Sequence, residues 1–251
     1  MKIPVMTFNI QHGVDYLRCK EAGEKGFHDL DLIDLDLMAD AIRQCGAEIV
    51  GLNEVRGNGG IPAYVDQAEI LAAKLGYHAY FAQAVYVKGG GPYGNAILSK
   101  YPLMKAERIL IEDPPVRDED TNYETRCLLK AELDLAGGLT VYVCHFGLAK
   151  AEAKSAVRTL LEQLDQQTRP CVFMGDLNLT PDSEILAPIY ERLQDTAAVF
   201  THPQLSWPSD IPERKIDYIF ASRDIQVLAA EIPEVVASDH RPYTALLEIG
   251  R

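Results

Sequence analysis

Basic residues are scarce in this sequence relative to acidic ones. It contains 24 Lys and Arg against 37 Asp and Glu, which gives a formal net charge of −13. Sequence-independent binding to nucleic acid rests largely on Lys and Arg side chains that neutralise phosphates. The charge balance therefore disfavours a DNA or RNA substrate, although a local basic patch could override the total.

Cysteine pairs and long apolar runs are also missing. The five cysteines are odd in number and contain no C-x-x-C pair, so we expect reduced, mostly buried thiols and not a zinc or redox site. No stretch of ~18 apolar residues occurs, and the apolar start of the chain is interrupted at Asn9. A membrane span and a signal peptide are therefore unsupported, and a cytoplasmic location is expected.

What the sequence does contain is enough apolar material for one large core. The chain has 251 residues, of which 47% are hydrophobic, so we expect residues 1–251 to form a single domain, and a monomer. Short β-branched and aromatic runs alternate with helical patterns, which predicts an α/β architecture. Helices are expected at 33–45, 65–75, 149–167 and 181–192. Strands are expected at 2–10, 48–53, 77–85, 95–100, 126–135, 139–145, 171–174, 216–221, 225–231 and 243–249.

Polar residues gather where these predicted strands end. A packed sheet brings such ends together at one rim, so the polar side chains should meet there. Carboxylate and amide oxygens suit Mg²⁺ or Mn²⁺, and a phosphate ester is hydrolysed with such a cation, a base that positions water and donors for the developing charge. The residues concerned are Asn9, Glu54, His145, Asp176, Asn178, Asp217, Asp239 and His240.

Each of these residues also has a simpler interpretation when taken alone. Glu54 directly follows a predicted strand and is the best single candidate for a metal ligand, but it could be a solvated loop carboxylate. Asp176 and Asn178 lie two residues apart, so both side chains can reach one site. Asp176 could deprotonate water and Asn178 could hold a phosphoryl oxygen. The same pair could instead form a turn or a helix cap.

The histidines leave similar alternatives open. Asp239 and His240 are adjacent, so that one could serve a metal and the other the phosphate. His145 ends an apolar run and could be an ordinary core histidine. Asp217 is harder to explain structurally, because a carboxylate inside an apolar strand needs a buried partner, such as a histidine that it orients.

Taken in order, eight short motifs resemble the motif series of the endonuclease/exonuclease/phosphatase superfamily, over nearly the whole chain. They are Thr7-Phe8-Asn9-Ile10, Asn53-Glu54-Val55, Gly94-Asn95-Ala96-Ile97-Leu98-Ser99, Glu124-Thr125-Arg126, His145-Phe146-Gly147, Gly175-Asp176-Leu177-Asn178, Ile216-Asp217-Tyr218-Ile219 and Ser238-Asp239-His240. The resemblance implies a DNase I-like four-layer α/β sandwich, with two mixed β-sheets face to face and helices outside. It also implies Mg²⁺- (or Mn²⁺-) dependent hydrolysis of a phosphate ester.

The resemblance also assigns roles to residues. It implies that Asn9, Glu54 and Asp239 bind metal, that Asp176 positions the nucleophilic water, and that Asn178 holds the phosphate. His240 would contact the scissile phosphate and be oriented by Asp217, while His145 would act in acid/base catalysis or phosphate contact. Asn95 and Arg126 would contact substrate, and Glu124 would support Arg126.

The sequence departs from this family pattern beside the first strand. In abasic-site endonucleases an Asp stands two residues after the first-strand Asn, and here that position is Gln11, followed by His12. The number of metal ions, and whether Gln11 or His12 is a ligand, stay open.

Substrate choice should reside in loops, because this superfamily spans several kinds of phosphoesterase. The expected walls are the segment after Gly13, residues 89–94 and residues 206–212. In the last of these, Trp207 could stack on a substrate or could be a packed anchor, and the loop resembles those of uncharacterised bacterial members.

We expect hydrolysis of a small-molecule or lipid-headgroup phosphodiester by in-line attack of water. A nuclease acting on DNA or RNA is the first alternative. A non-catalytic binding module is the second, and it would predict that some of the catalytic-type residues are missing, whereas none is.

Overall fold

Two six-stranded mixed β-sheets form the centre of the computed structural model, which describes residues 1–23, 30–117, 119–135 and 137–250. The first sheet has the order β11 (Gln226–Glu231), β12 (Tyr243–Glu248), β1 (Lys2–Asn9), β2 (Ile49–Arg56), β4 (Pro92–Ser99), β3 (His78–Tyr86). The second has the order β5 (Leu103–Leu110), β6 (Cys127–Leu133), β7 (Leu139–Cys144), β8 (Cys171–Asp176), β10 (Asp217–Ala221), β9 (Gln194–Asp195). The pairs β1–β2 and β7–β8 are parallel and the other pairs are antiparallel.

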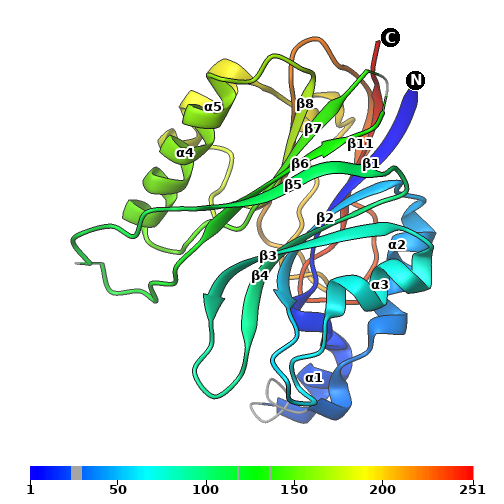
Figure 1. Cartoon of the computed structure of the whole chain (residues 1–251), viewed down its shortest axis with the longest axis vertical. Helices are drawn as coiled ribbons and strands as arrows, with labels where there is room; N and C mark the ends of the chain where they lie inside the picture. Colours follow the sequence, from blue (N-terminus) through cyan, green and yellow to red (C-terminus); the bar gives the residue numbers. More distant parts are fainter. Residues whose placement is uncertain (24–29, 118, 136, 251) are drawn as a thin grey trace.

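Helices cover the outer face of each sheet, which confirms the predicted four-layer sandwich (Figure 1). Helices α2 (Leu35–Cys45) and α3 (Gln67–Leu75) pack on the first sheet, and α4 (Lys150–Leu164) and α5 (Ala187–Arg192) pack on the second. A third apolar cluster lies between the sheets and takes residues from both of them. Among the described residues, no helix has the length and apolar character needed to cross a bilayer.

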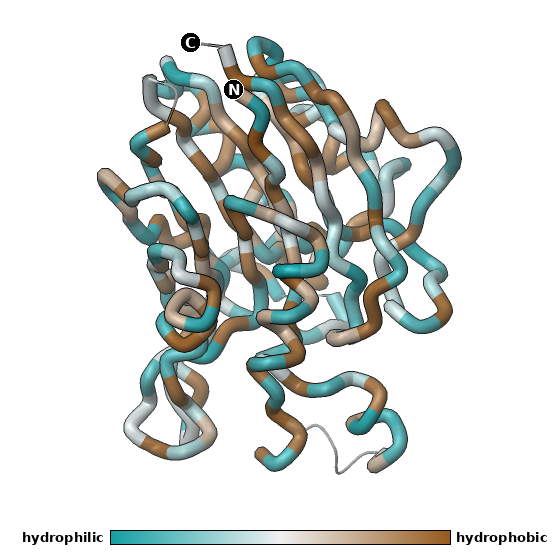
Figure 2. The backbone as a smooth tube through the Cα atoms, turned by 90° about the vertical axis from the view of Figure 1, so that its right-hand side faces the viewer, coloured by the Kyte–Doolittle hydropathy of each residue, from teal (hydrophilic) through white to brown (hydrophobic). Residues whose placement is uncertain are grey.

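The central strands are apolar because both of their faces are covered. All six residues of β7 and of β8 are buried, whereas β12 alternates between buried and partly exposed positions. In Figure 2 the apolar segments accordingly follow the strands through the body of the molecule. Gly51 lets the sheets approach closely, because a Cβ atom there would come within 2.7 Å of the Met174 sulfur.

Local sequence explains where the helices begin and end. Asp34 caps α2 by accepting a hydrogen bond from the Leu37 amide (2.9 Å), and Asp66 caps α3 in the same way. Both helices stop at a left-handed glycine, Gly46 and Gly76, as the sequence predicts.

Several elements differ from those expected. Helix α1 (Tyr16–Ala22) and strands β5 and β9 were not predicted, and the single helix expected over 181–192 is a turn followed by the 3₁₀ helix η4 (Glu184–Leu186) and α5. Strand β2 continues to Arg56, and β4 begins at Pro92, three residues before the start expected for that strand. Among the described residues, the other 3₁₀ helices are η1 (Gln11–Gly13), η3 (Leu30–Leu32) and η5 (Thr196–Val199). Residues 24–29, in the predicted wall after Gly13, and Ala136, between the strands expected at 126–135 and 139–145, lie outside the described residues.

Candidate active site

A cavity of about 520 Å³ lies at the rim where β1, β2, β7 and β8 end and β10 begins. Glu54, Asp176 and Asp239, which are far apart in the sequence, all line it. The complete lining is Glu54, Thr121, Arg126, His145, Leu148, Asp176, Asn178, Trp207, Arg214, Ile216, Asp239 and His240. The sandwich therefore brings the predicted carboxylates to one place.

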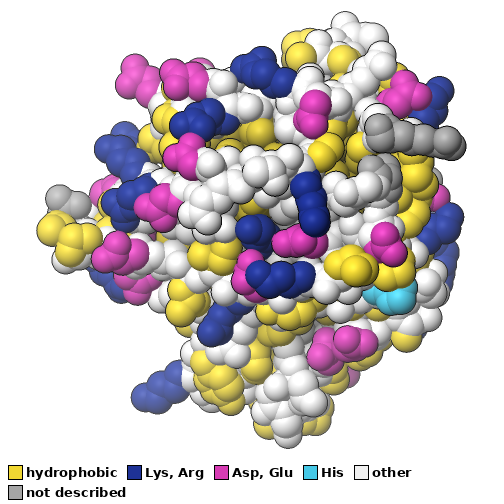
Figure 3. Space-filling view, turned by 45° about the horizontal axis from the view of Figure 1, so that its top comes forward, with side chains coloured by type: hydrophobic (Ala, Val, Ile, Leu, Met, Phe, Trp, Pro, Cys, Tyr) yellow, Lys and Arg dark blue, Asp and Glu magenta, His cyan; other side chains and the backbone are white. Residues whose placement is uncertain are grey.

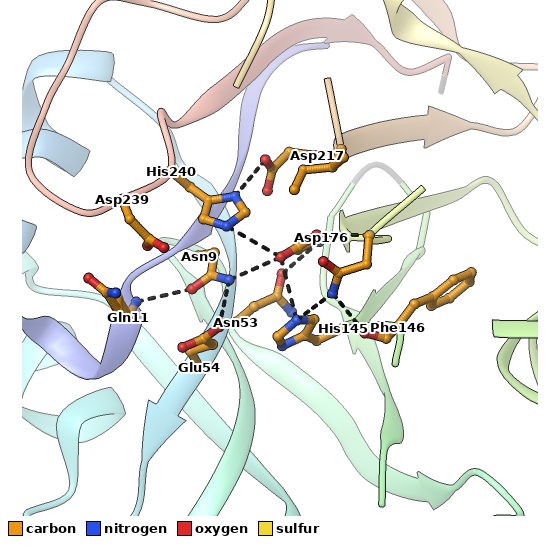
Figure 4. A network of polar contacts seen from close by, with 12 residues as sticks. Asn9, Gln11, Asn53, Glu54, His145, Phe146, Asp176, Asp217, Asp239 and His240 are labelled. Atoms are coloured by element: carbon orange, nitrogen blue, oxygen red, sulfur yellow. Dashed lines mark hydrogen bonds and ion pairs between the residues drawn. The ribbon is translucent and has the colours of Figure 1, made fainter. Parts of the chain in front are cut away.

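Asp176 lies at the centre of this group and is 1% exposed (Figure 4). Its Oδ2 accepts a hydrogen bond from the side-chain Nδ2 of Asn9 (3.1 Å), and its Oδ1 accepts one from the backbone amide of Asn178 (2.9 Å). Burial raises the pKa of Asp176 to about 7, although the nearby His240 opposes the shift. A carboxylate of this kind can take up a proton near neutral pH.

Glu54 enters the cavity because strand β2 is irregular there. The register with β4 shifts between Leu52 and Val55, and Glu54 has a positive φ of 58°. Its carboxylate accepts hydrogen bonds from Asn9 Nδ2 (3.1 Å) and from the Tyr93 hydroxyl (2.7 Å). The Asn9 amide thus lies between the carboxylates of Glu54 and Asp176 and donates to both.

His240 lies between two carboxylates. Its Nδ1 is 2.8 Å from Asp217 Oδ2 and its Nε2 is 3.5 Å from Asp176 Oδ2. Desolvation lowers the pKa of His240, but the charges of Asp217 and Asp176 outweigh it and raise that pKa well above its ordinary value. In this arrangement the ring is an imidazolium, and Asp217, which is fully buried, fixes its orientation.

His145 has the opposite character. Burial, together with the positive charges of Arg126 and His240, holds its pKa well below the ordinary value, so the ring is neutral. Arg126 Nη1 lies 3.1 Å from Nδ1, and an arginine can only donate, so Nδ1 accepts and Nε2 carries the proton. This Nε2 lies 3.4 Å from Asp176 Oδ2, which can accept its proton, and 3.1 Å from the side-chain Nδ2 of Asn178, which is itself a donor and does not accept it. The two histidines therefore flank Asp176 in different protonation states.

Asp239 is linked to the loop formed by residues 206–214. Burial and the charge of Glu54 raise the pKa of Asp239, whereas the positive charge of His240 and hydrogen bonds from the side chains of Ser238 and Trp207 oppose that rise. The loop is also attached through its backbone, because the Ser209 amide donates to the Asp239 carbonyl (2.7 Å). Trp207 thus contacts one of the expected metal ligands as well as lining the cavity.

Comparison with known proteins connects this site to a family. Residues 6–240 match the family model described as Endonuclease/Exonuclease/phosphatase family. The chain belongs to this family. Its members are generally metal-dependent phosphoesterases.

Solved structures of the endonuclease/exonuclease/phosphatase family share the fold. A Beutenbergia cavernae protein is 25% identical, with a TM-score of 0.74 over 99% of this chain and 72% of that one. A Bacteroides vulgatus protein is 21% identical, with a TM-score of 0.74 over 99% of both chains. A Bacteroides thetaiotaomicron protein named mannosyl-6-phosphatase is 15% identical, with a TM-score of 0.74 over 98% of this chain and 100% of that one. A comparison with curated proteins gave no match.

Members of this family are generally metal-dependent, and two groupings of side chains in this chain offer ligand atoms for a cation. Asp176, Asp217 and His240 place one ligand-type atom each within 4.8 Å of one another, in the part of the chain that the structure describes, but His240 would be a ligand only after losing the proton of its imidazolium form. Glu54, Asp239 and Asn9 form an oxygen-rich set on the other side of Asp176 (Figure 4). Burial is the main cause of the raised pKa values of Asp176 and Asp239, and repulsion from neighbouring carboxylates adds to it; a bound divalent cation would offset both by favouring the charged carboxylates.

Two of the predicted substrate contacts are placed differently from each other. Arg126 lines the cavity, and its guanidinium is held by Glu124 (2.9 Å). Asn95 is 2% exposed and is absent from the lining; its amide contacts Asn53 and the Cys127 carbonyl. Asn95 therefore lies behind the site, where it supports Asn53.

Sequence reasoning missed three residues that shape the site. Asn53 joins the two sheets, since its Oδ1 accepts a hydrogen bond from the Asp176 amide (2.9 Å). Tyr93 donates to Glu54, and Arg214 lines the cavity beside Trp207. Asn53 could have been found from the sequence, because it is a polar residue at the end of an apolar run. Nothing in the sequence distinguishes Tyr93 and Arg214 from ordinary surface residues.

Proposed function

We propose that this protein hydrolyses a phosphate ester of a small molecule or lipid headgroup, with a phosphodiester as the first candidate, using Mg²⁺ or Mn²⁺. The observation that carries the proposal is Asp176, a buried carboxylate with a raised pKa at the centre of a cavity that also contains Glu54, Asp239 and His240. Such a group is suited to accept a proton from an attacking water molecule.

The remaining residues supply the other parts of the reaction. Glu54, Asp239 and Asn9 would hold the cation, which when bound would polarise a phosphoryl oxygen and offset the charge of the transition state. The imidazolium of His240 and the amide of Asn178 would stabilise the phosphoryl oxygens, with Asp217 holding His240 in position. Neutral His145 would donate Nε2–H toward the same region, because Arg126 fixes its tautomer.

The size of the cavity and the net charge of the chain favour a small substrate over a polynucleotide. A volume of about 520 Å³ lies in the usual range for small-molecule sites. The net charge is −13, and on the face shown in Figure 3 basic and acidic side chains are interspersed without a broad basic area. The sugar phosphate implied by the name of the Bacteroides thetaiotaomicron neighbour is one candidate within this class.

The test is a substrate panel with Mn²⁺ or Mg²⁺, and with EDTA as the metal-free control. Bis-p-nitrophenyl phosphate, p-nitrophenyl phosphate and supercoiled plasmid DNA separate phosphodiesterase, phosphatase and nuclease activity. Asp176→Asn should lower turnover by about 10²–10⁴-fold, because it removes the proton acceptor. Asp165→Asn, an equal change at a surface carboxylate paired with Arg192, should leave turnover unchanged.

Two outcomes would contradict the proposal. One is the absence of metal-dependent hydrolysis of every ester in the panel. The other is hydrolysis that Asp176→Asn leaves within a few-fold of the wild type. Nicking of the plasmid that far exceeds hydrolysis of the small esters would replace the proposal with a nuclease.

A further inference from the structure

Two arginines line the cavity, and their environments differ. The Arg126 side chain is 13% exposed and is held by Glu124 and His145. Arg214 is exposed, and its guanidinium carbon lies 5.7 Å from the centroid of the Trp207 ring. Within the described residues, Arg18 and Arg214 are the arginines whose side chains have neither a hydrogen bond nor an ion pair. Arg214 is thus the cavity-lining guanidinium whose donors have no protein acceptor.

The backbone that carries Arg214 is well anchored. Trp207 and Arg214 form an antiparallel bridge, with N–O distances of 3.0 Å and 2.9 Å in the two directions. The same loop is bonded to Asp239 through the Ser209 amide and the Trp207 side chain. The backbone position of Arg214 is therefore fixed relative to an expected metal ligand, and the guanidinium lies within cation–π distance of the indole.

The strand order places the two arginines on opposite sides of Asp176. Along the second sheet the order is β6, β7, β8, β10. Arg126 directly precedes β6 and Asp176 ends β8, whereas Arg214 lies three residues before β10. A phosphate bound at Asp176 would have Arg126 and His145 on one side and Arg214 with Trp207 on the other.

We infer that Arg214 is a specificity-determining residue that binds a second anionic group of the substrate, a phosphate or a carboxylate, on the Trp207 side of the cavity. The inference rests on the proposed phosphoesterase function. A guanidinium presents paired N–H donors that match both kinds of anion, and a substrate anion would supply the acceptors that the protein does not. The preferred substrate class is then a phosphate ester with at least two separate anionic groups.

The test compares three compounds that share one phosphate ester. Glucose 6-phosphate has no second anionic group, 6-phosphogluconate adds a carboxylate, and glucose 1,6-bisphosphate adds a phosphate. We expect the wild type to bind the last two more tightly, and the stronger of the two identifies the type of anion. Arg214→Gln should reduce the affinity for that compound by roughly 10- to 100-fold more than it reduces the affinity for glucose 6-phosphate.

Binding is measured by calorimetry with Mn²⁺ present in the Asp176→Asn background, so that the result does not depend on turnover. Arg214→Lys, which keeps the charge but loses the planar pair of donors, should retain part of the preference. The matched control is Arg18→Gln, which changes the other arginine without a side-chain partner. This variant should retain the full preference for the compound with a second anionic group. In the wild-type background the same Arg214→Gln change should act mainly on KM and little on kcat.

Several results would overturn the inference. These are equal affinities for the three compounds, no measurable binding of any of them, or a preference that survives in Arg214→Gln. The inference would then fail even if Asp176-dependent hydrolysis of other esters supports the proposed function. Conversely, Arg214-dependent binding without hydrolysis of any ester would contradict the proposed function alone.

Discussion

Four non-glycine residues have positive φ angles in the described chain, and all of them lie at or beside the candidate site. They are Gln11, His12, Glu54 and Asn178, with φ between 45° and 58°. Such conformations cost of the order of 1–3 kcal/mol each and persist only where the surrounding structure imposes them. Here they aim Glu54 and Asn178 into the cavity, so the strain coincides with the residues to which we assign function.

Lys215 is a buried cation near the site whose titration can be followed through stability. It is 7% exposed, its Nζ lies 3.4 Å from the Tyr218 ring centroid and 3.7 Å from Asp195, and burial lowers its pKa from 10.5 to about 8. Between pH 8 and 10.5 the unfolded lysine holds a proton that the folded one has released. The free energy of unfolding of the wild type should therefore rise with pH in this window, relative to Lys215→Met, by about 3 kcal/mol at most.

Urea denaturation of both proteins at pH 7, 8, 9 and 10 measures this difference. Subtracting the Lys215→Met values removes the contribution of tyrosines and other groups that titrate in the same range. If the two curves stay parallel from pH 7 to 10, the pKa of Lys215 is not lowered in the folded protein.

The type of site could be predicted from sequence better than its contacts. Asp217 was expected to need a buried partner, and the structure gives it His240 at 2.8 Å. Asn95 was expected to touch substrate, but it lies behind Asn53. Strand ends can be located from sequence, whereas the direction of a side chain depends on register shifts and bulges that no local pattern encodes.

At the scale of elements, prediction worked where burial is strong. Strands such as 139–145 and 171–174 are continuous apolar runs, and helices α2 and α3 end at glycine as expected. Strand β5 was missed because it is an edge strand that pairs with β6 alone and is largely exposed, so charged residues interrupt its pattern. Helix α1 was missed because seven residues carry little periodic signal.

The contact between strands β7 and β8 requires a glycine. A Cβ atom at Gly175 would lie 1.8 Å from the Cys144 carbonyl oxygen, and its φ of 151° is unfavourable for other residues. Gly175→Ala should therefore destabilise the protein by more than about 3 kcal/mol, because the strands must separate beside Asp176. Gly76→Ala isolates the cost of a left-handed backbone, since nothing lies within 4 Å there, and should cost about 1 kcal/mol.

Chemical denaturation of both glycine variants gives the comparison. Equal losses of stability in the two proteins would show that β7 and β8 can accommodate a methyl group. The overlap at Gly175 would then not constrain the strand that ends in Asp176.

At the scale of the whole molecule, the site depends on both sheets at once. Asn9 and Glu54 come from the first sheet and Asp176 from the second, and a shared apolar core joins them. We therefore expect the single domain predicted from sequence to unfold in one step, with far-UV circular dichroism and hydrolytic activity lost together. Monomeric state and cytoplasmic location stay predictions from sequence.

Leu129, fully buried between the sheets, provides the variant for this experiment. Leu129→Ala should lower the free energy of unfolding by about 2–5 kcal/mol and shift both signals equally. Met104→Ala, at a side chain on β5 that is 68% exposed, should change it by less than about 0.5 kcal/mol. Two separated transitions would indicate sheets that unfold independently.

The bond between the Trp207 side chain and Asp239 has a practical consequence. Trp207 is the only tryptophan in the chain, so the intrinsic fluorescence of the protein on selective excitation comes from a single indole. That indole contacts the carboxylate of Asp239, to which we assign metal binding, and the guanidinium of Arg214 lies near its ring. The molecule therefore contains its own optical reporter, through which the arrival of an ion on one side and of a ligand on the other can be followed without any label.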